Sequence, residues 1–211
     1  MTKKTGDEFR EELVWRASFE TVGRWGIPVV RRQPLVDGEI DLISCADARP
    51  HNVPANTSRG LHFFVDDPRF EVVYTQPELT FPKYGQYRFM LTPDYSVYAD
   101  MKPWQQLQSV AKSRWCGAFW QSKGKTVYPT MAWGSPQSFE FCFLGYERGG
   151  TVAVSTVGCR LAETGFMLGY REMLRALEPE HVICLGRPFD GMEGEADLIV
   201  VDYMGSRRTV R

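Results

Sequence analysis

Residues 61–68 read LHFFVDDP, a short apolar run followed by two aspartates and a proline. A run of this length between polar segments is typical of a buried strand. Asp66 or Asp67 can cap a helix that Pro68 begins, because proline is well tolerated at the first helical position. The stretch therefore predicts a strand that is followed almost at once by a helix.

The same order of strand and helix recurs toward the C-terminus. Five further apolar runs are predicted as strands: Tyr87–Leu91, Thr126–Met131, Thr151–Ser155, His181–Leu185 and Leu198–Val201. Apolar residues at helical spacing predict helices over about 100–122 and 161–177. Toward the N-terminus, the expected elements are a helix and two short strands: Asp7–Val22, Val29–Arg31 and Ile40–Ser44.

This alternation predicts an α/β fold with a mostly parallel sheet and helices on both faces. Nearly continuous apolar strands agree, because such strands are buried on both sides. With the N-terminal segments the count reaches up to eight strands, which permits a compact or incomplete β/α-barrel-like form. We favour that form, and an open doubly wound sheet is the alternative.

The composition is that of a globular protein, with 43% hydrophobic and 24% charged residues. We expect a single α/β domain over residues 1–211, with an N-terminal helical extension over about 1–28 and a short basic C-terminal tail over about 204–211. A formal net charge of −1 does not indicate nucleic acid or membrane as a partner. Five cysteines without C-x-x-C spacing, and no apolar segment near the N-terminus, indicate a cytoplasmic protein with reduced thiols.

In a parallel α/β fold, function is located at the carboxyl ends of the strands. Three acids are expected there and are candidate catalytic or metal-binding residues, since carboxylates bind divalent cations and transfer protons: Asp66, Asp67 and Asp94. Other residues expected on this rim are candidates for ligand binding: Trp133, Ser135, Ser155, Thr156 and Arg187. Several of these are also residue types that cap helices, so capping is the alternative interpretation.

The charge is unevenly placed along the chain. Between Met101 and Phe139 there is no acid, and five cations predict a positive binding patch on the long helix and the turn after it: Lys102, Lys112, Arg114, Lys123 and Lys125. Aromatic residues alternate with these cations, as in proteins that bind single-stranded nucleic acid. Their helical spacing equally suits core packing. An acidic protein partner fits the same patch.

Several segments resemble one known family, the domain of unknown function 4417. The resemblance covers roughly Val29 to Gly186 and lies in "GLHFFVDDPRFE", "LTPDYSVYADM", "SRWCGAFWQSKGKTVYPTMAWG", "SFEFCFLG" and "GTVAVSTVGC". It implies an origin in a bacteriophage or other mobile element and a location in the cytoplasm of a bacterial host. It implies no catalytic residues.

Three functions are consistent with these observations. The first is a phage or mobile-element accessory protein that binds a protein partner or DNA, for example a recombinase, a replication factor or a host factor. The second is a metal-dependent hydrolase or phosphoryl-transfer enzyme that holds a divalent cation on Asp66, Asp67 and Asp94. The third is a small-molecule binding module in which Trp133 and Arg187 hold a planar anion. Neighbouring genes for an integrase or for replication would favour the first.

Overall fold

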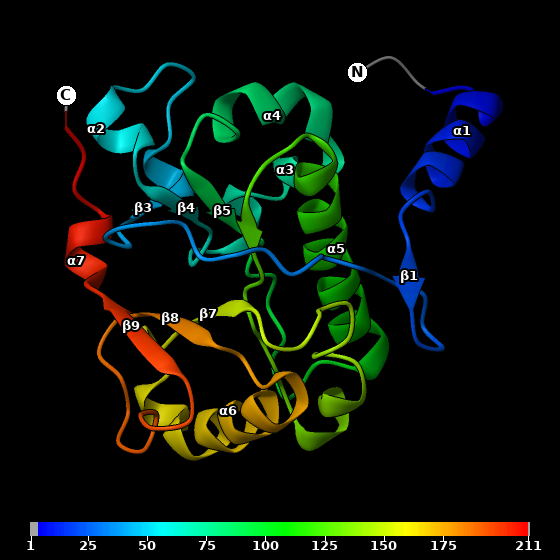
Figure 1. The fold of residues 1–211 in the computed structure, drawn as a ribbon. Helices are drawn as coiled ribbons and strands as arrows, with labels where there is room; N and C mark the ends of the chain where they lie inside the picture. The colour runs from blue at the N-terminus through cyan, green and yellow to red at the C-terminus, as the bar shows by residue number, and fades with distance from the viewer. Residues whose placement is uncertain (1–3, 211) are drawn as a thin grey trace.

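The computed structural model describes residues 4–210, which form two parallel sheets and the helices packed around them (Figure 1). The first sheet has the order β3-β4-β5-β6, with strands Leu42–Ser44, Gly60–His62, Phe89–Leu91 and Val127–Tyr128. The second sheet has the order β7-β8-β9, with strands Thr151–Ser155, His181–Leu185 and Asp197–Val201. All neighbouring strands within these two sheets are parallel, which confirms the predicted class.

A single bridge joins the two sheets. Thr130 pairs in parallel with Ala153, so the strand order follows the chain from β3 to β9. Within residues 4–210 no pairing connects β9 back to β3, and the sheets do not close into a barrel. Helix α7 (Tyr203–Ser206) follows β9 and contacts β3 at this open side (Figure 1). The arrangement is therefore an open α/β form, the incomplete version of the predicted barrel.

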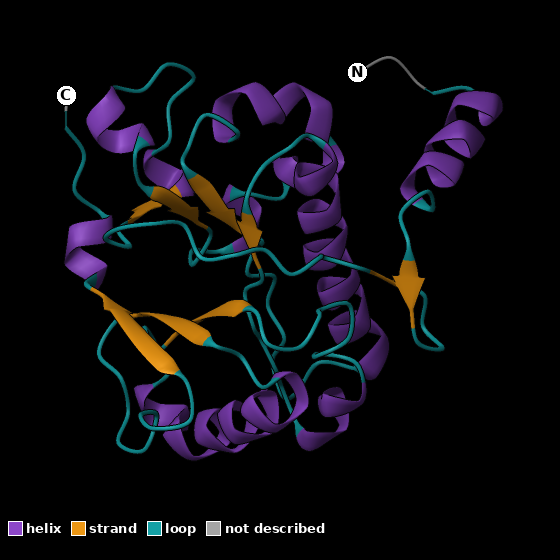
Figure 2. Cartoon of the chain, viewed as in Figure 1, coloured by secondary structure: helices purple, strands orange, loops and turns teal. Residues whose placement is uncertain are grey.

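Helices lie on the outer sides of the two sheets (Figure 2). The amphipathic helix α6 (Glu163–Leu177) buries the face that the apolar spacing predicted. The long helix α5 (Pro103–Ser122) buries Trp115 and Phe119 as predicted, but Arg114 is also buried and Trp104 is exposed. Three short helices pack around the first sheet: α2 (Pro54–Thr57), α3 (Val72–Thr75) and α4 (Pro77–Tyr84). Apolar side chains from both sheets meet in one core cluster between them: Leu42, Phe89, Leu91, Tyr128, Ala153, Ile183, Leu185 and Val201.

An extended segment, residues 29–41, runs across the amino ends of the strands (Figure 1). The Tyr128 hydroxyl fixes it by accepting from the Val36 amide at 2.8 Å and donating to the Pro34 carbonyl at 2.9 Å. Leu35, Val36 and Ile40 pack against the cluster between the sheets. This segment covers the amino end of that cluster, so an opening remains at the carboxyl ends of the strands.

The two ends of the chain are attached to the body. Helix α1 (Gly6–Arg16) is followed by a hairpin of β1 (Thr21–Val22) and β2 (Ile27–Pro28). The Trp15 ring packs edge-on against Trp115 of α5, with ring centres 5.0 Å apart. At the other end, the Asn56 side chain exchanges two hydrogen bonds with the Val210 backbone. No helix in the described part of the chain is long and apolar enough to span a bilayer.

Candidate functional site

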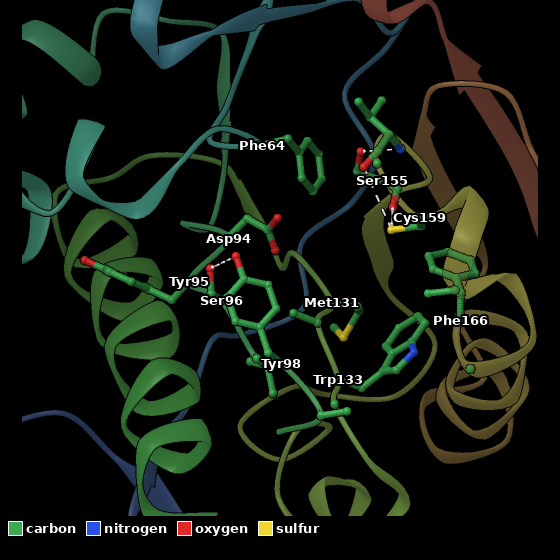
Figure 3. A pocket seen from close by; sticks show the side chains of 18 of the residues that line it. Phe64, Asp94, Tyr95, Ser96, Tyr98, Met131, Trp133, Ser155, Cys159 and Phe166 are labelled. Atoms are coloured by element: carbon green, nitrogen blue, oxygen red, sulfur yellow. Dashed lines mark hydrogen bonds between the residues drawn. The ribbon is translucent and has the colours of Figure 1, made fainter. Parts of the chain in front are cut away.

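A cavity of about 630 Å³ opens at the carboxyl ends of β4, β5, β6 and β7 (Figure 3). The loop that follows each of these strands lines it, because the carboxyl ends of adjacent parallel strands lie at one edge. Phe64 follows β4, Asp94 follows β5, Trp133 follows β6, and Cys159 follows β7. Phe166 completes the wall from the first turns of helix α6. The functional edge expected from sequence is therefore the place where the structure has a cavity.

The Asp94 carboxyl projects into this cavity, between the rings of Phe64 and Tyr98 (Figure 3). Among residues 4–210, no side chain or backbone group is hydrogen-bonded to its carboxyl. Burial raises the pKa of Asp94 to about 7, and the negative charge of nearby Asp67 contributes in the same direction. A carboxyl group that titrates near neutral pH in a cleft is a typical functional group, able to bind a ligand or to transfer a proton.

Asp67 has a different role from Asp94. Its carboxylate accepts two kinds of hydrogen bond from Ser96, one from the amide at 3.1 Å and one from the hydroxyl at 2.9 Å. Ser96 in turn lies 3.1 Å from the hydroxyl of Tyr98. Asp67 thus fixes the loop that carries Asp94 and Tyr98, and it does not itself line the cavity.

Asp66 lies at the mouth of the cavity and is exposed to solvent. Together with Asp67 and Asp94 it was the candidate metal site. Among the described residues, no group of three His, Cys, Asp or Glu side chains is placed so that it could hold a metal ion. The three acids reach one edge of the fold without forming such a group.

Helix capping, the alternative interpretation of these aspartates and serines, does not account for their positions either. The Asp66 and Ser135 side chains stand at the starts of short 3₁₀ helices and accept no capping hydrogen bond there. The Asp67 carboxylate is directed to Ser96 instead. Ser155 accepts from the Val157 amide at 3.2 Å, which closes a turn.

The predicted ligand rim is only partly assembled. Trp133 and Ser155 line the cavity, whereas Ser135, Thr156 and Arg187 do not. Thr156 is buried and donates to the Arg187 carbonyl at 2.9 Å, while the Arg187 side chain is exposed outside the cavity. Arg187 therefore does not reach the cavity beside Trp133, and the predicted planar anion would lack this cation there.

The predicted basic patch is not formed as one exposed surface. Arg114 is only 2% exposed: it donates to the carbonyls of Cys142 and Leu144 and lies 4.0 Å above the Tyr146 ring. Lys112 pairs with Glu71 at 2.6 Å, and Lys123 pairs with Glu78 at 3.0 Å.

The two remaining cations of the predicted patch differ from each other. The Lys125 ammonium donates to the Tyr87 carbonyl at 2.7 Å, and burial lowers its pKa. Lys102 is exposed. Because four of the five cations are buried, paired or bonded to backbone, the prediction of exposed Lys112 and Arg114 is wrong.

Two further residues shape the site and were not found from sequence. Gly169 of α6 lets the Trp133 ring lie against the helix backbone, since a Cβ there would be 2.2 Å from the indole nitrogen. Buried Gln106 of α5 donates to the Tyr98 carbonyl at 2.7 Å and so holds the loop at the mouth. A small residue among large ones on a helix is the signal that points to Gly169.

The fold and the cavity define a class: an open parallel α/β protein with a cavity at the carboxyl edge of its strands. The chain belongs to the family described as Domain of unknown function (DUF4417), whose model matches residues 19–204. The resemblance seen in the sequence is thereby confirmed.

Two relatives come from bacteriophages. The chain is 37% identical to the Gene 1 protein of Mycobacterium phage L5 over 175 residues, which is 82% of this chain and 76% of the relative. It is 37% identical to the Gene 1 protein of Mycobacterium phage D29, with 64% of that relative covered. No solved structure matches the chain significantly. A phage context is thus found among the relatives, as the resemblance implied.

Proposed function

We propose that the protein binds a small organic molecule in the cavity at the carboxyl edge. One observation carries the proposal: the Asp94 carboxyl projects into a cavity with aromatic walls and has no hydrogen-bonding partner among the residues described. Asp94 is partly exposed inside the cavity, so its carboxyl is free to accept hydrogen bonds from a ligand that enters. Small-molecule sites typically combine apolar walls with a few polar groups in this way.

The size of the cavity suits this function. Its volume of about 630 Å³ lies within the range of about 300–1,000 Å³ that is usual for ligand sites. Its walls come mainly from the loops that follow four strands and from the start of helix α6, and contacts such as that of Asp67 with Ser96 hold these loops in place. A preformed cavity of this kind needs little reorganisation to bind a ligand.

Cys159 offers a direct test of occupancy. It lines the cavity and is partly exposed, whereas Cys45, Cys116, Cys142 and Cys184 are buried. The native protein is treated with iodoacetamide in the presence of a mixture of aromatic fragments that are anionic, neutral and cationic. Mass spectrometry of the Cys159 peptide then measures the alkylation rate. We expect at least one fragment to protect Cys159, and protection by none would contradict the proposal.

A second candidate function is the binding of a protein partner, the accessory role indicated by the sequence. The observation that favours it is an exposed apolar rim: Tyr98 and Val157, which line the cavity, are 64% and 38% exposed, and Leu161, next in the chain to the lining residue Ala162, is fully exposed. A recombinase, replication or host protein would cover this rim. DNA as the partner receives less support, because most of the predicted cations are not free.

Site-specific photocrosslinking tests this second function. A benzophenone amino acid placed at position 161 is compared with the same group at position 79, an exposed leucine on α4. A host or phage protein captured at position 161 and not at position 79 is the expected result. Equal capture at both positions would mean that the rim has no special affinity for a partner.

A further inference from the structure

The chemical class of the ligand follows from the charges that line the cavity. Its walls contain two acids, Asp66 and Asp94, and none of the described residues that line it is Lys, Arg or His. Arg160 follows the lining residue Cys159 in the chain, but it does not line the cavity, and its guanidinium lies over the Phe189 ring. An anion such as a phosphate would meet only negative charge here, so the site disfavours anionic ligands.

The hydrogen-bonding groups that line the cavity further restrict the chemical class of the ligand. Ser96 is engaged with Asp67, and the Tyr98 hydroxyl lies within hydrogen-bonding distance of Ser96. The Ser155 hydroxyl is placed to donate to the Leu185 carbonyl at 3.3 Å. Two carboxyl groups remain, Asp66 at the exposed mouth and Asp94 inside the cavity, and Asp94 is the one that lies among the aromatic walls. A carboxyl accepts two parallel N–H bonds from an amidine-like edge, in which a ring nitrogen and an amino group lie side by side.

Aromatic side chains surround the position in front of this carboxyl. Phe64 and Tyr98 flank Asp94, and Trp133 and Phe166 lie across the cavity (Figure 3). The rings of Trp133 and Phe166 are themselves in contact, with centres 5.2 Å apart. Aromatic rings bind planar molecules by stacking and attract cations above their faces.

We propose that the ligand is a planar nitrogen heterocycle, neutral or cationic and without phosphate, that presents an amino-amidine edge to Asp94. Nucleobases with an exocyclic amino group belong to this class. The inference rests on the proposed function, because it assumes that the cavity is occupied. Beyond the binding function, the inference specifies the polar edge and the charge that a ligand must have to bind.

Three probes of similar shape separate this class from the alternatives. 2-Aminobenzimidazole is planar and carries the required edge, indole is a bicyclic ring without it, and 2-naphthoate is a planar anion. Their affinities are measured by calorimetry, and occupancy by protection of Cys159 from alkylation. We expect 2-aminobenzimidazole to bind at least about tenfold more tightly than either of the others, the value of one charge-assisted hydrogen bond.

Variants of the two acids provide the matched control. Asp94→Asn keeps the shape of the side chain and should weaken 2-aminobenzimidazole binding at least about tenfold while leaving indole binding unchanged. Asp66→Asn removes the charge at the exposed mouth and should weaken binding less than Asp94→Asn does, because solvent screens an exposed charge. Circular dichroism and thermal unfolding verify that both variants are folded. If Asp94→Asn does not fold, the ligand class is tested by the order of affinity of the three probes for the unaltered protein.

The outcomes separate the two proposals. Equal or tighter binding of indole or 2-naphthoate, with protection of Cys159, would overturn the ligand class and leave the binding function standing. Failure of every fragment, whatever its charge, to protect Cys159 would overturn both. Loss of 2-aminobenzimidazole binding in Asp66→Asn but not in Asp94→Asn would also overturn the class, because recognition would then lie at the mouth.

Discussion

The Trp133 indole lies directly against the backbone of helix α6 at Gly169, where a Cβ atom would be 2.2 Å from the indole nitrogen. No real Cβ contact is that short, so the ring keeps its place only because residue 169 has no side chain. Trp133 forms one wall of the cavity. The shape of the cavity thus depends on a glycine in the helix behind it.

Gly169→Ala is therefore expected to displace Trp133. The added methyl group overpacks the contact, and we expect a loss of about 1–3 kcal/mol in the free energy of unfolding. Gly165→Ala is the matched control, because Gly165 lies in the same helix and nothing is within 4 Å of its Cβ position. Alanine there should be neutral or stabilising by up to about 1 kcal/mol. Urea unfolding followed by tryptophan fluorescence measures both, and equal effects would contradict the contact.

Arg114 is expected to be a structural residue of the core. Arg114→Met leaves the carbonyls of Cys142 and Leu144 without their donor, and we expect a loss of about 2–4 kcal/mol in stability. Lys102→Met, at an exposed position in front of the same helix, should stay within about 0.5 kcal/mol of the native protein. Chemical denaturation provides the values. Equal stability of the two variants would mean that Arg114 is not held as described.

The error about Arg114 has a physical reason. A cation in an acid-free stretch suggests an exposed surface, yet position 114 lies four residues from Val110 and four from Ala118, which are both buried. Helical periodicity therefore places Arg114 on the buried face, and its guanidinium reaches backbone carbonyls there. The ion pairs of Lys112 and Lys123 could not be predicted from sequence, because their partners are distant in the chain: Glu71 precedes α3 and Glu78 lies in α4.

Two strands and part of the cavity lining could be predicted from sequence, because they depend on the local pattern of apolar residues and on the geometry of parallel strands. The runs 151–155 and 181–185 form strands with the predicted bounds, since apolar runs of this length fit a buried parallel strand. Asp66, Asp94, Trp133 and Ser155 reach one cavity because the carboxyl ends of parallel strands share an edge. Closure of the barrel could not be predicted, because it depends on pairing between the first and last strands, which no local pattern specifies. The aromatic walls of the cavity could not be predicted either. They come from loops whose paths are set by tertiary contacts such as that of Asp67 with Ser96.

His62 is expected to make the protein sensitive to acid. Its ring is buried against Ser206 at 3.1 Å, and burial lowers its pKa from 6.5 to about 3. Below pH 6.5 the unfolded chain takes up a proton at His62 that the folded protein refuses until about pH 3. The contribution to stability is therefore complete above pH 6.5 and is lost as the pH falls toward 3.

The measurement is urea unfolding between pH 4 and pH 7, a range that starts above the folded pKa of about 3 and crosses the ordinary value of 6.5. His62→Gln should lose less stability on acidification than the native protein, and His51→Gln, at an exposed position, should behave as the native protein does. The titration of Asp94 acts in the opposite direction, but it is common to all three proteins and cancels in the comparison. An unchanged slope in His62→Gln would contradict the neutral buried ring.

Cys159 should report the charge of Asp94. Burial raises the pKa of the Cys159 thiol, and the negative charge of Asp94 raises it further. Asp94→Asn removes that charge, so the thiolate fraction and the alkylation rate at Cys159 should increase. Iodoacetamide kinetics at pH 8 measure the rate, with Asp66→Asn as the control. A rate in Asp94→Asn at or below that of the native protein would place Asp94 too far from the thiol.

The most direct test of the account is the titration of Asp94 itself. Carbon-detected NMR follows the side-chain carboxyl carbons of the free protein from pH 3 to pH 9, and the spectrum of Asp94→Asn assigns the signal. The account predicts a midpoint of about 7 for Asp94, and a lower midpoint when 2-aminobenzimidazole is bound, because the ligand donates hydrogen bonds to the ionised form. A midpoint near the ordinary value of 3.8, unchanged by the probe, would show that Asp94 is neither buried nor available for a ligand in the way proposed.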